Sequence, residues 1–263
     1  MEHFVWNVEP TIFKLGFLQL RWYGLLFVGS FILGLIIMKK IFIKEGKDAS
    51  SLDNLLIYAL VGAIIGARLV HCLFYEPNYY LNHPLEILYI WKGGLASHGG
   101  MIGVIVGVYL YTKQNKLPFF WLLARMAIPG ALTAAFVRFG NLFNSEILGK
   151  PSELSWAIVF EKVDNIPRHP VQLYEAFSYL IIFAILIVVY RKISPSFSTK
   201  LLPGLFLTLI FSVRFLLEYT KTEQATYSPS IPLTVGQMLS TPFIIFGVIW
   251  CIWAYKSSKR GSK

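Results

Sequence analysis

The sequence predicts an all-α polytopic membrane protein with about seven transmembrane helices. Hydrophobic residues make up 56% of the 263-residue chain and charged residues only 14%, whereas soluble domains carry about 25% charged residues. Apolar runs of about 20 residues, which is the length that crosses a bilayer as a helix, recur along the chain. A protein this apolar needs lipid against its outer faces, so the composition excludes an ordinary soluble protein.

Seven apolar segments are the expected transmembrane helices, and short polar segments separate most of them. The third segment is short, and the fifth and seventh are the clearest. In chain order the segments are residues 17–38, 52–74, 98–112, 119–137, 171–190, 201–219 and 236–255.

The distribution of Lys and Arg predicts the orientation of these helices. If the N-terminus lies outside, the inner loops hold more than twice as many Lys and Arg residues as the outer loops, as the positive-inside rule requires. The sequence therefore predicts an N-out, C-in topology. The net charge of +10 then reflects loops that face the cytoplasm and anionic lipid, and we do not expect nucleic acid as a partner.

Two outer segments, residues 75–97 and 139–170, are longer than the inner loops. The first mixes aromatic residues with prolines and is expected to lie at the membrane interface. The second is expected to form a small extracytoplasmic head, roughly residues 140–170, with a strand or two, and Pro167 and Pro170 close it. Because no internal repeat is visible, we interpret residues 1–263 as a single membrane-embedded domain.

Charged residues within the apolar segments need an explanation, because a charge at the bilayer centre costs about 2.5–3.5 kcal/mol. Arg138 lies at the outer end of the fourth segment, and Asn141 and Glu146 follow it in VRFGNLFNSE. If the helix continues, Arg138 and Asn141 share a face, and a guanidinium beside amide groups suits a phosphate or carboxylate. The alternative is an arginine that reaches the interface beside ordinary turn asparagines.

Arg214 and Glu218 lie four residues apart in SVRFLLEYT, toward the outer end of the sixth segment. They could form an internal ion pair that offsets its own burial. Alternatively, Arg214 is a second cation at the depth of Arg138. Two cations at one depth suggest a shared anion, and a phospholipid headgroup is the obvious candidate.

Other residues each allow a functional and a structural interpretation. His98 opens the third segment between glycines in GGLASHGG, and an imidazole with a pKa of about 6.5 can act as a base near neutral pH, although a hydrogen-bonded structural histidine is more common. Arg68 lies among small residues that permit tight helix packing and could pair with a Glu. Tyr23 could belong to an aromatic belt. Cys72 and Cys251 are expected to be small hydrophobic side chains.

Six segments occur in an order that resembles the phosphatidylglycerol–prolipoprotein diacylglyceryl transferases of bacterial inner membranes. They are LRWYG, GARL, GGLASHGG, RFGNLFNSEILG, HPVQLYEA and RFLLEY. The resemblance implies transfer of the diacylglyceryl group of phosphatidylglycerol to the lipobox cysteine thiol just after the signal peptide of a prolipoprotein. Such transfer is the first step of lipoprotein maturation, it forms a thioether and releases glycerol phosphate, and it takes place on the extracytoplasmic side of the inner membrane.

The resemblance also implies roles for individual residues. The catalytic residues would be His98, Arg138, Arg214 and Glu218, with His98 as the first and Glu218 as the second candidate for the general base. The substrate-binding residues would be Arg138, Asn141, Glu146, Tyr23, Arg68 and Gly149. No metal, nucleotide or other cofactor is implied. The chain departs from the family pattern after Glu218, because YTKTEQ follows where Arg-Pro-Asp is common.

Two other classes of function compete with the transferase interpretation. A transporter or lipid flippase also uses intramembrane arginines and glycine-rich helices, but it should carry polar residues into the inner halves of its helices, which here are apolar apart from Arg125. A purely structural membrane protein would not need His98, Arg138 and Arg214 on the outer side.

Overall fold

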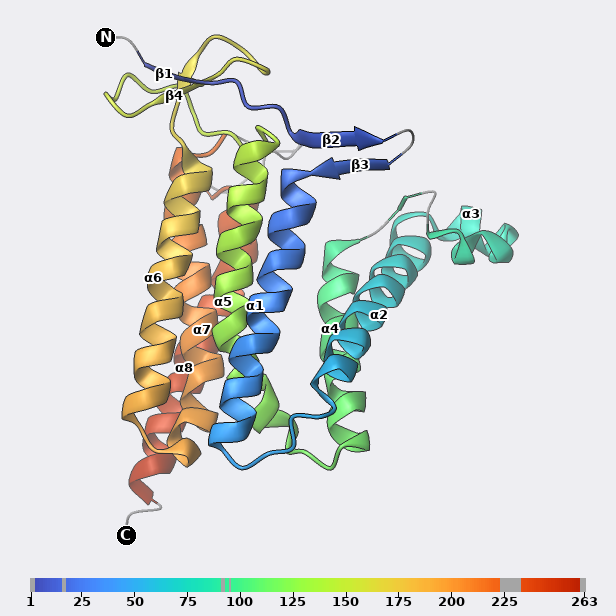
Figure 1. The fold of residues 1–263 in the computed structure, drawn as a ribbon, viewed down its shortest axis with the longest axis vertical. Helices are drawn as coiled ribbons and strands as arrows, with labels where there is room; N and C mark the ends of the chain where they lie inside the picture. Colours follow the sequence, from blue (N-terminus) through green and yellow to red (C-terminus); the bar gives the residue numbers. More distant parts are fainter. Residues whose placement is uncertain (1–2, 16–17, 91–92, 95, 223–232, 261–263) are drawn as a thin grey trace. The chain divides into compact units, whose positions relative to one another are not determined.

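Long helices dominate the computed structural model, which describes residues 3–15, 18–90, 93–94, 96–222 and 233–260 (Figure 1). In this part of the chain, six helices are long and apolar enough to cross a membrane. They are Trp22–Lys44, Leu52–Tyr75, Phe119–Phe143, Val171–Lys192, Pro195–Thr220 and Val235–Lys259. The predicted class, an all-α polytopic membrane protein, is confirmed. The orientation of the helices stays a prediction.

The third predicted segment forms helix α4 (Ser97–Gln114), but α4 is not among the six spans identified in the described residues. The number of transmembrane helices therefore stays a prediction. The chain divides into two compact units, one formed by Met1–Ile37 with Ala124–Lys263 and the other by Met38–Leu123. The interpretation of residues 1–263 as a single domain also stays a prediction.

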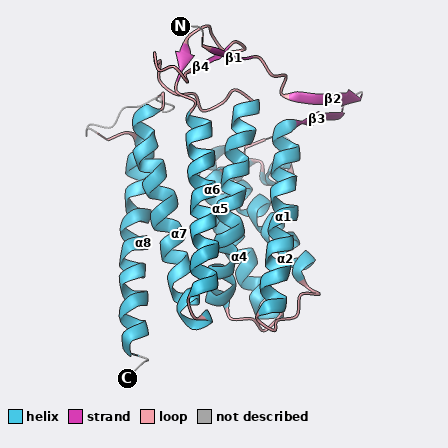
Figure 2. Cartoon of the chain, turned by 60° about the vertical axis from the view of Figure 1, so that its left-hand side comes forward, coloured by secondary structure: helices cyan, strands magenta, loops and turns pink. Residues whose placement is uncertain are grey.

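The first unit is a helical bundle that carries short strands at one end (Figure 2). It contains α6 (Val171–Lys192), α7 (Pro195–Leu217), α8 (Val235–Arg260) and most of α1 (Trp22–Lys44) and α5 (Phe119–Phe143). Helices α7 and α8 approach closely at Gly204. A Cβ there would lie 3.0 Å from Cys251 Sγ and from the Gly247 carbonyl oxygen. Cys251 thus packs at a helix contact, as expected of a small hydrophobic side chain.

Helices α7 and α5 of this unit extend beyond the predicted segments. Helix α7 begins at Pro195 rather than at residue 201, since the Ser194 hydroxyl accepts a hydrogen bond from the Phe197 N–H at 3.3 Å and proline fits the first helical turn. Helix α5 continues to Phe143 rather than ending at residue 137. The helix can include Arg138 because a carboxylate from α6 pairs with its guanidinium.

The expected head contributes two strands to a three-stranded sheet in the order β1 (Phe4–Trp6), β4 (Ile158–Phe160), β5 (Pro167–Arg168). Strand β4 pairs parallel with β1 and antiparallel with β5. Buried Ile158 and Phe160 pack with Leu142 from α5, and Trp6 covers them. The prediction of one or two strands in this segment is confirmed, whereas β1 was not predicted because a three-residue strand has no readable periodicity.

The start of the first predicted transmembrane segment was wrong. Strands β2 (Thr11–Leu15) and β3 (Leu18–Arg21) form an antiparallel hairpin, and α1 begins only at Trp22. The segment LQLR alternates apolar and polar residues, which favours a strand over a helix.

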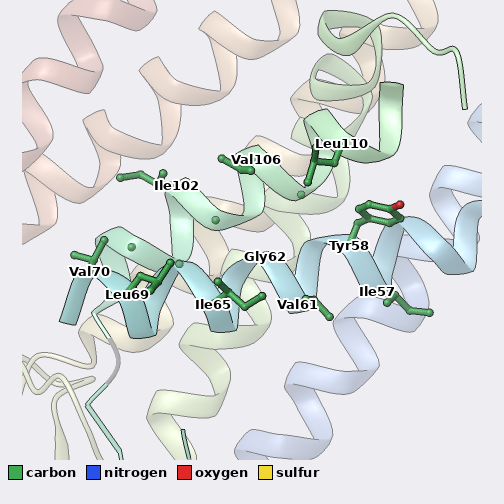
Figure 3. A pocket seen from close by; sticks show the side chains of 14 residues that line it. Ile57, Tyr58, Val61, Gly62, Ile65, Leu69, Val70, Ile102, Val106 and Leu110 are labelled. Atoms are coloured by element: carbon green, nitrogen blue, oxygen red, sulfur yellow. The ribbon is translucent and has the colours of Figure 1, made fainter. Parts of the chain in front are cut away.

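The second unit is built on two helices that cross at glycines. Helix α2 (Leu52–Val70) continues into η1 (His71–Tyr75), and α3 (Pro77–Asn82) and η2 (Pro84–Leu88) precede α4. A Cβ at Gly103 would lie 2.6 Å from the Gly62 carbonyl carbon and 3.1 Å from the Gly66 Cα. Branched apolar side chains beside this crossing line a cavity of about 570 Å³ (Figure 3). The predicted tight helix packing around GARL is confirmed.

Arg68 fixes the connection between α2 and α4. Its guanidinium donates to four carbonyl oxygens, those of Ile87 at 2.9 Å, Gly93 at 2.5 Å, Gly94 at 3.2 Å and Glu86 at 2.7 Å. The guanidinium also lies 5.0 Å from the centroid of the Tyr80 ring, and the residue is 3% exposed. These contacts make Arg68 a structural anchor of its own unit, and its role in substrate binding stays a prediction.

Candidate active site

The segment RFGNLFNSEILG, residues 138–149, is called the RFGN segment. It begins in the last turns of α5 in the first unit. Arg138 Nη1 donates to Asn141 Oδ1 at 3.2 Å, and Asn141 Nδ2 donates to Glu146 Oε2 at 3.1 Å. Residues three apart on a helix are neighbours, so the prediction that Arg138 and Asn141 share a face is confirmed. Asn141 is buried whereas Glu146 is exposed, so this chain of hydrogen bonds runs from the bundle to its surface.

The backbone after α5 turns sharply and brings Glu146 back toward the helix. Ser145 and Ile147 have φ angles of 53° and 57°, a left-handed conformation that is costly for a β-branched residue such as Ile147. Hydrogen bonds around Glu146 offset that cost. Its N–H donates to the Asn141 carbonyl at 2.9 Å, its Oε1 accepts from Asn144 at 3.1 Å, and its carbonyl accepts from Gln172 of α6 at 2.6 Å.

Gly140 allows α1 to approach α5 at the site. A Cβ at Gly140 would lie 2.6 Å from Tyr23 Cδ2 and 3.1 Å from Tyr23 Cγ, so the ring occupies the place that any other side chain would need. Tyr23 is half-buried in the first turn of α1. The structure therefore brings Tyr23 to the RFGN segment, although the two are more than a hundred residues apart in sequence.

Glu175 of α6 is the centre of the charged groups at this end of the unit. Its side chain is 0% exposed, and its Oε2 lies 2.9 Å from Arg138 Nε while its Oε1 lies 2.9 Å from Lys221 Nζ. The Tyr179 hydroxyl donates to Oε1 at 3.4 Å. A buried carboxylate is tolerated only when it is paired and hydrogen-bonded, and Glu175 meets both conditions.

Lys221 extends the charged group toward Glu218. Its Nζ lies 3.3 Å from Glu218 Oε2. The Glu218 carboxylate in turn packs on Gly236, where a Cβ would lie 2.6 Å from Oε2. Gly236 is in the first turn of α8, and the N-terminus of a helix attracts negative charge. We call the linked residues Arg138, Glu175, Lys221 and Glu218 the charge cluster.

Arg214 lies near this cluster but does not pair with Glu218. Both Arg214 and Arg138 are close enough to the Tyr179 hydroxyl to act on it electrostatically. In the described part of the chain, the ion-pair partner of Glu218 is Lys221, so the internal Arg214–Glu218 pair is not observed. Arg138 and Arg214 belong to the same unit, on α5 and α7 respectively.

Gly149 joins the end of the RFGN segment to Lys221, which follows the short helix Glu218–Thr220 after α7. It forms an isolated antiparallel bridge with Lys221, and a Cβ there would lie 2.6 Å from His169 Cβ. These contacts explain why the position needs a glycine, and its contribution to substrate binding stays a prediction.

His98 lies in the first turn of α4 in the second unit, and its side chain is outside what the structure describes. Its assignment as the general base therefore stays a prediction. Glu223 and Gln224, the end of the segment that departs from the family pattern, also lie outside the described residues.

The sequence analysis missed three residues of the site. Glu175 was not recognised as the partner of Arg138, because the two are far apart in the chain. Lys221 is a loop lysine by its position in the sequence, and nothing in the sequence singles out Tyr179. The only available signal for Lys221 was its position three residues after Glu218, a spacing that places two side chains together at a helix end.

Comparisons with known proteins match this chain to one protein family. The family model for prolipoprotein diacylglyceryl transferase matches residues 10–253. A phosphatidylglycerol–prolipoprotein diacylglyceryl transferase from Tolumonas auensis is 48% identical over 97% of this chain and 99% of its own length. Proteins of the same name from Chloroherpeton thalassium and Bacteroides fragilis are 46% and 40% identical, and the matches cover 98% and 92% of this chain and 97% and 92% of those proteins.

Proposed function

Since this chain belongs to the prolipoprotein diacylglyceryl transferase family, we propose that it transfers the diacylglyceryl group of phosphatidylglycerol to a cysteine thiol of a prolipoprotein. The sulfur attacks the glyceryl carbon that bears the phosphate. A C–S bond forms, the C–O bond breaks, and its electrons leave with the oxygen as glycerol phosphate. The thiol proton goes to a base on the enzyme. Atoms and charge balance without a cofactor.

The fixed orientation of Arg138 is the observation that carries this proposal. Arg138 is 12% exposed, and Glu175 and Asn141 fix its guanidinium in one orientation. A fixed guanidinium can bind phosphate oxygens and stabilise the charge that grows on them as the C–O bond breaks. Arg214 of α7, in the same unit, is the proposed second cation for the non-bridging oxygens of the phosphate.

Two residues remain candidates for the base that accepts the thiol proton. Only a thiolate attacks well, and a free thiol has a pKa of about 8.5, so a base or a positive field has to assist at neutral pH. His98 is the first candidate and Glu218 the second. The position of Glu218 in the cluster supports a place near the reacting groups, whereas His98 rests on the family resemblance.

We further propose that the acceptor is the lipobox cysteine and that the protein resides in the bacterial inner membrane with its site toward the extracytoplasmic side. The excess of Lys and Arg in the expected inner loops supports this orientation. The charge cluster lies at the strand-bearing end of the first unit, where α5 ends and α6 begins. The expected N-out topology assigns this end to the outer side.

Purified protein in detergent with phosphatidylglycerol and a lipobox peptide tests the proposal. We expect a peptide heavier by one diacylglyceryl group, and no such product with a Cys→Ser peptide, because the hydroxyl is a far weaker nucleophile at neutral pH. Phosphatidylcholine should substitute poorly for phosphatidylglycerol. Absence of the thioether with the intact substrates would contradict the transferase proposal. Lipid movement between leaflets without product, measured with the protein reconstituted in vesicles, would favour a flippase.

A further inference from the structure

We propose that Lys221 is a positioning residue for the reaction, which keeps Arg138 available to the lipid phosphate by sharing the charge of Glu175. This inference rests on the proposed function. Lys221 lies in the segment that departs from the family pattern, and its side chain is 5% exposed. Its ammonium lies 2.9 Å from Glu175 Oε1 and 3.3 Å from Glu218 Oε2.

The pairing pattern of Glu175 explains why a second cation matters. Arg138 contacts one of its carboxylate oxygens and Lys221 the other. If Lys221 were neutral, Arg138 would be the only ion-pair partner of Glu175 among the described residues. The carboxylate would then balance the guanidinium charge, and less of that charge would act on a phosphate. Lys221 also links this balance to Glu218, so both carboxylates keep fixed positions.

The backbone holds Lys221 firmly in this position. The Lys150 N–H donates to the Thr220 carbonyl at 2.8 Å, and the Thr222 N–H donates to the Leu148 carbonyl at 3.1 Å. These hydrogen bonds bracket Lys221 and tie it to the end of the RFGN segment. The ammonium therefore does not depend on a flexible loop to reach the carboxylates of Glu175 and Glu218.

Lys221→Met and Lys221→Arg test the inference, with Lys150→Met as the control because Lys150 is a neighbouring but exposed lysine. We expect Lys221→Met to raise the KM for phosphatidylglycerol at least about tenfold, the effect of weakening one charge-assisted hydrogen bond, with a smaller change in kcat. Lys221→Arg should restore most of the affinity, and Lys150→Met should behave as wild type.

A second measurement distinguishes positioning from a purely structural role. In a Glu175→Gln background the carboxylate charge is gone, so adding Lys221→Met should change the KM much less than it does in the wild type. Binding of phosphatidylglycerol in detergent, followed without peptide, gives the same comparison without turnover. If wild type binds the lipid but makes no thioether, the proposed function fails while this comparison still tests Lys221.

Three results would overturn the inference. The first is an unchanged KM and lipid affinity in folded Lys221→Met. The second is full additivity with Glu175→Gln. The third is a Lys221→Arg variant that folds, as judged by thermal unfolding and gel filtration, but binds the lipid no better than Lys221→Met.

Discussion

Gly140 and Glu175 show how much a single residue decides at the site. Glu175 has no exposed surface and pairs with cations from two other segments, so it orients Arg138 while Lys221 shares its charge. Gly140 contributes by lacking a side chain, because the Tyr23 ring fills the space beside its Cα. Glu175 acts through its charge and Gly140 through the small volume of its side chain. Both effects place groups of α1 and α6 against the end of α5.

Gly140→Ala should destabilise the protein and reduce transfer, because the new methyl group would overlap the Tyr23 ring. Overpacking of this kind costs about 1–3 kcal/mol. Gly130→Ala is the matched control in the same helix, since a Cβ there would lie 3.6 Å from the Phe206 ring, an ordinary contact. Thermal unfolding in detergent should show a lower Tm for Gly140→Ala only. Equal Tm values for the two variants would show that the ring moves aside without cost.

At the scale of elements, α2 and α4 depend on glycines for their contact. The backbones at Gly62 and Gly103 leave no room for a side chain between them, and without a hydrophobic driving force in lipid such close packing is what holds helices together. The short strands depend instead on their partners. Strand β4 is held by β1 from the N-terminus and by β5 from the same head.

Gly103→Ala should lower the Tm because the two helices must separate to admit the methyl group. Gly29→Ala in α1 is the control, since no atom lies within 4 Å of a Cβ at that position, and alanine there should be neutral or stabilising by about 0.5–1 kcal/mol. Thermal unfolding of both variants checks the prediction. A Gly103→Ala protein as stable as Gly29→Ala would contradict the observed crossing.

The head should show a pH-dependent stability that comes from Asp164. Arg168 Nη2 donates to Asp164 Oδ2 at 2.5 Å, and this hydrogen bond holds the pKa of the carboxyl below its ordinary value of about 3.9. A depressed pKa in the folded state stabilises the protein above the unfolded-state pKa. The contribution is lost as the pH falls through the folded-state pKa.

Asp164→Asn should therefore lower the Tm at pH 7 by a small amount, corresponding to less than about 1 kcal/mol because the pair is near the surface. The Tm difference from wild type should shrink as the pH falls below about 4. Glu161→Gln, at an exposed position of the same head, serves as the control. A Tm difference that stays constant from pH 7 to pH 3 would contradict the assignment to the Asp164–Arg168 pair.

At the scale of the whole molecule, composition and residue order predicted the membrane class, most of the helices and the family. Helix ends were less predictable. Arg138 ends an apolar run in the sequence, but α5 continues past it because Glu175 of α6 pairs with its guanidinium. The pairing of Arg138 with Glu175 could not be predicted, since it depends on how α5 and α6 pack. Lys221 was missed because loop lysines are usually exposed, and burial is a property of the fold.

The central claim is that Arg138, held by Glu175, binds the phosphate that leaves when the lipid carbon is transferred to sulfur. The most direct measurement uses phosphatidylglycerol labelled with ¹⁸O at the oxygen that joins the diacylglyceryl carbon to phosphorus, and compares wild type with Arg138→Gln. We predict equal amounts of thioether peptide and ¹⁸O-labelled glycerol phosphate from wild type. Folded Arg138→Gln should form both at least about 100-fold more slowly, as expected for the loss of a charge-stabilising donor. Label retained on the lipid product, or an Arg138→Gln variant with the wild-type rate, would contradict the account.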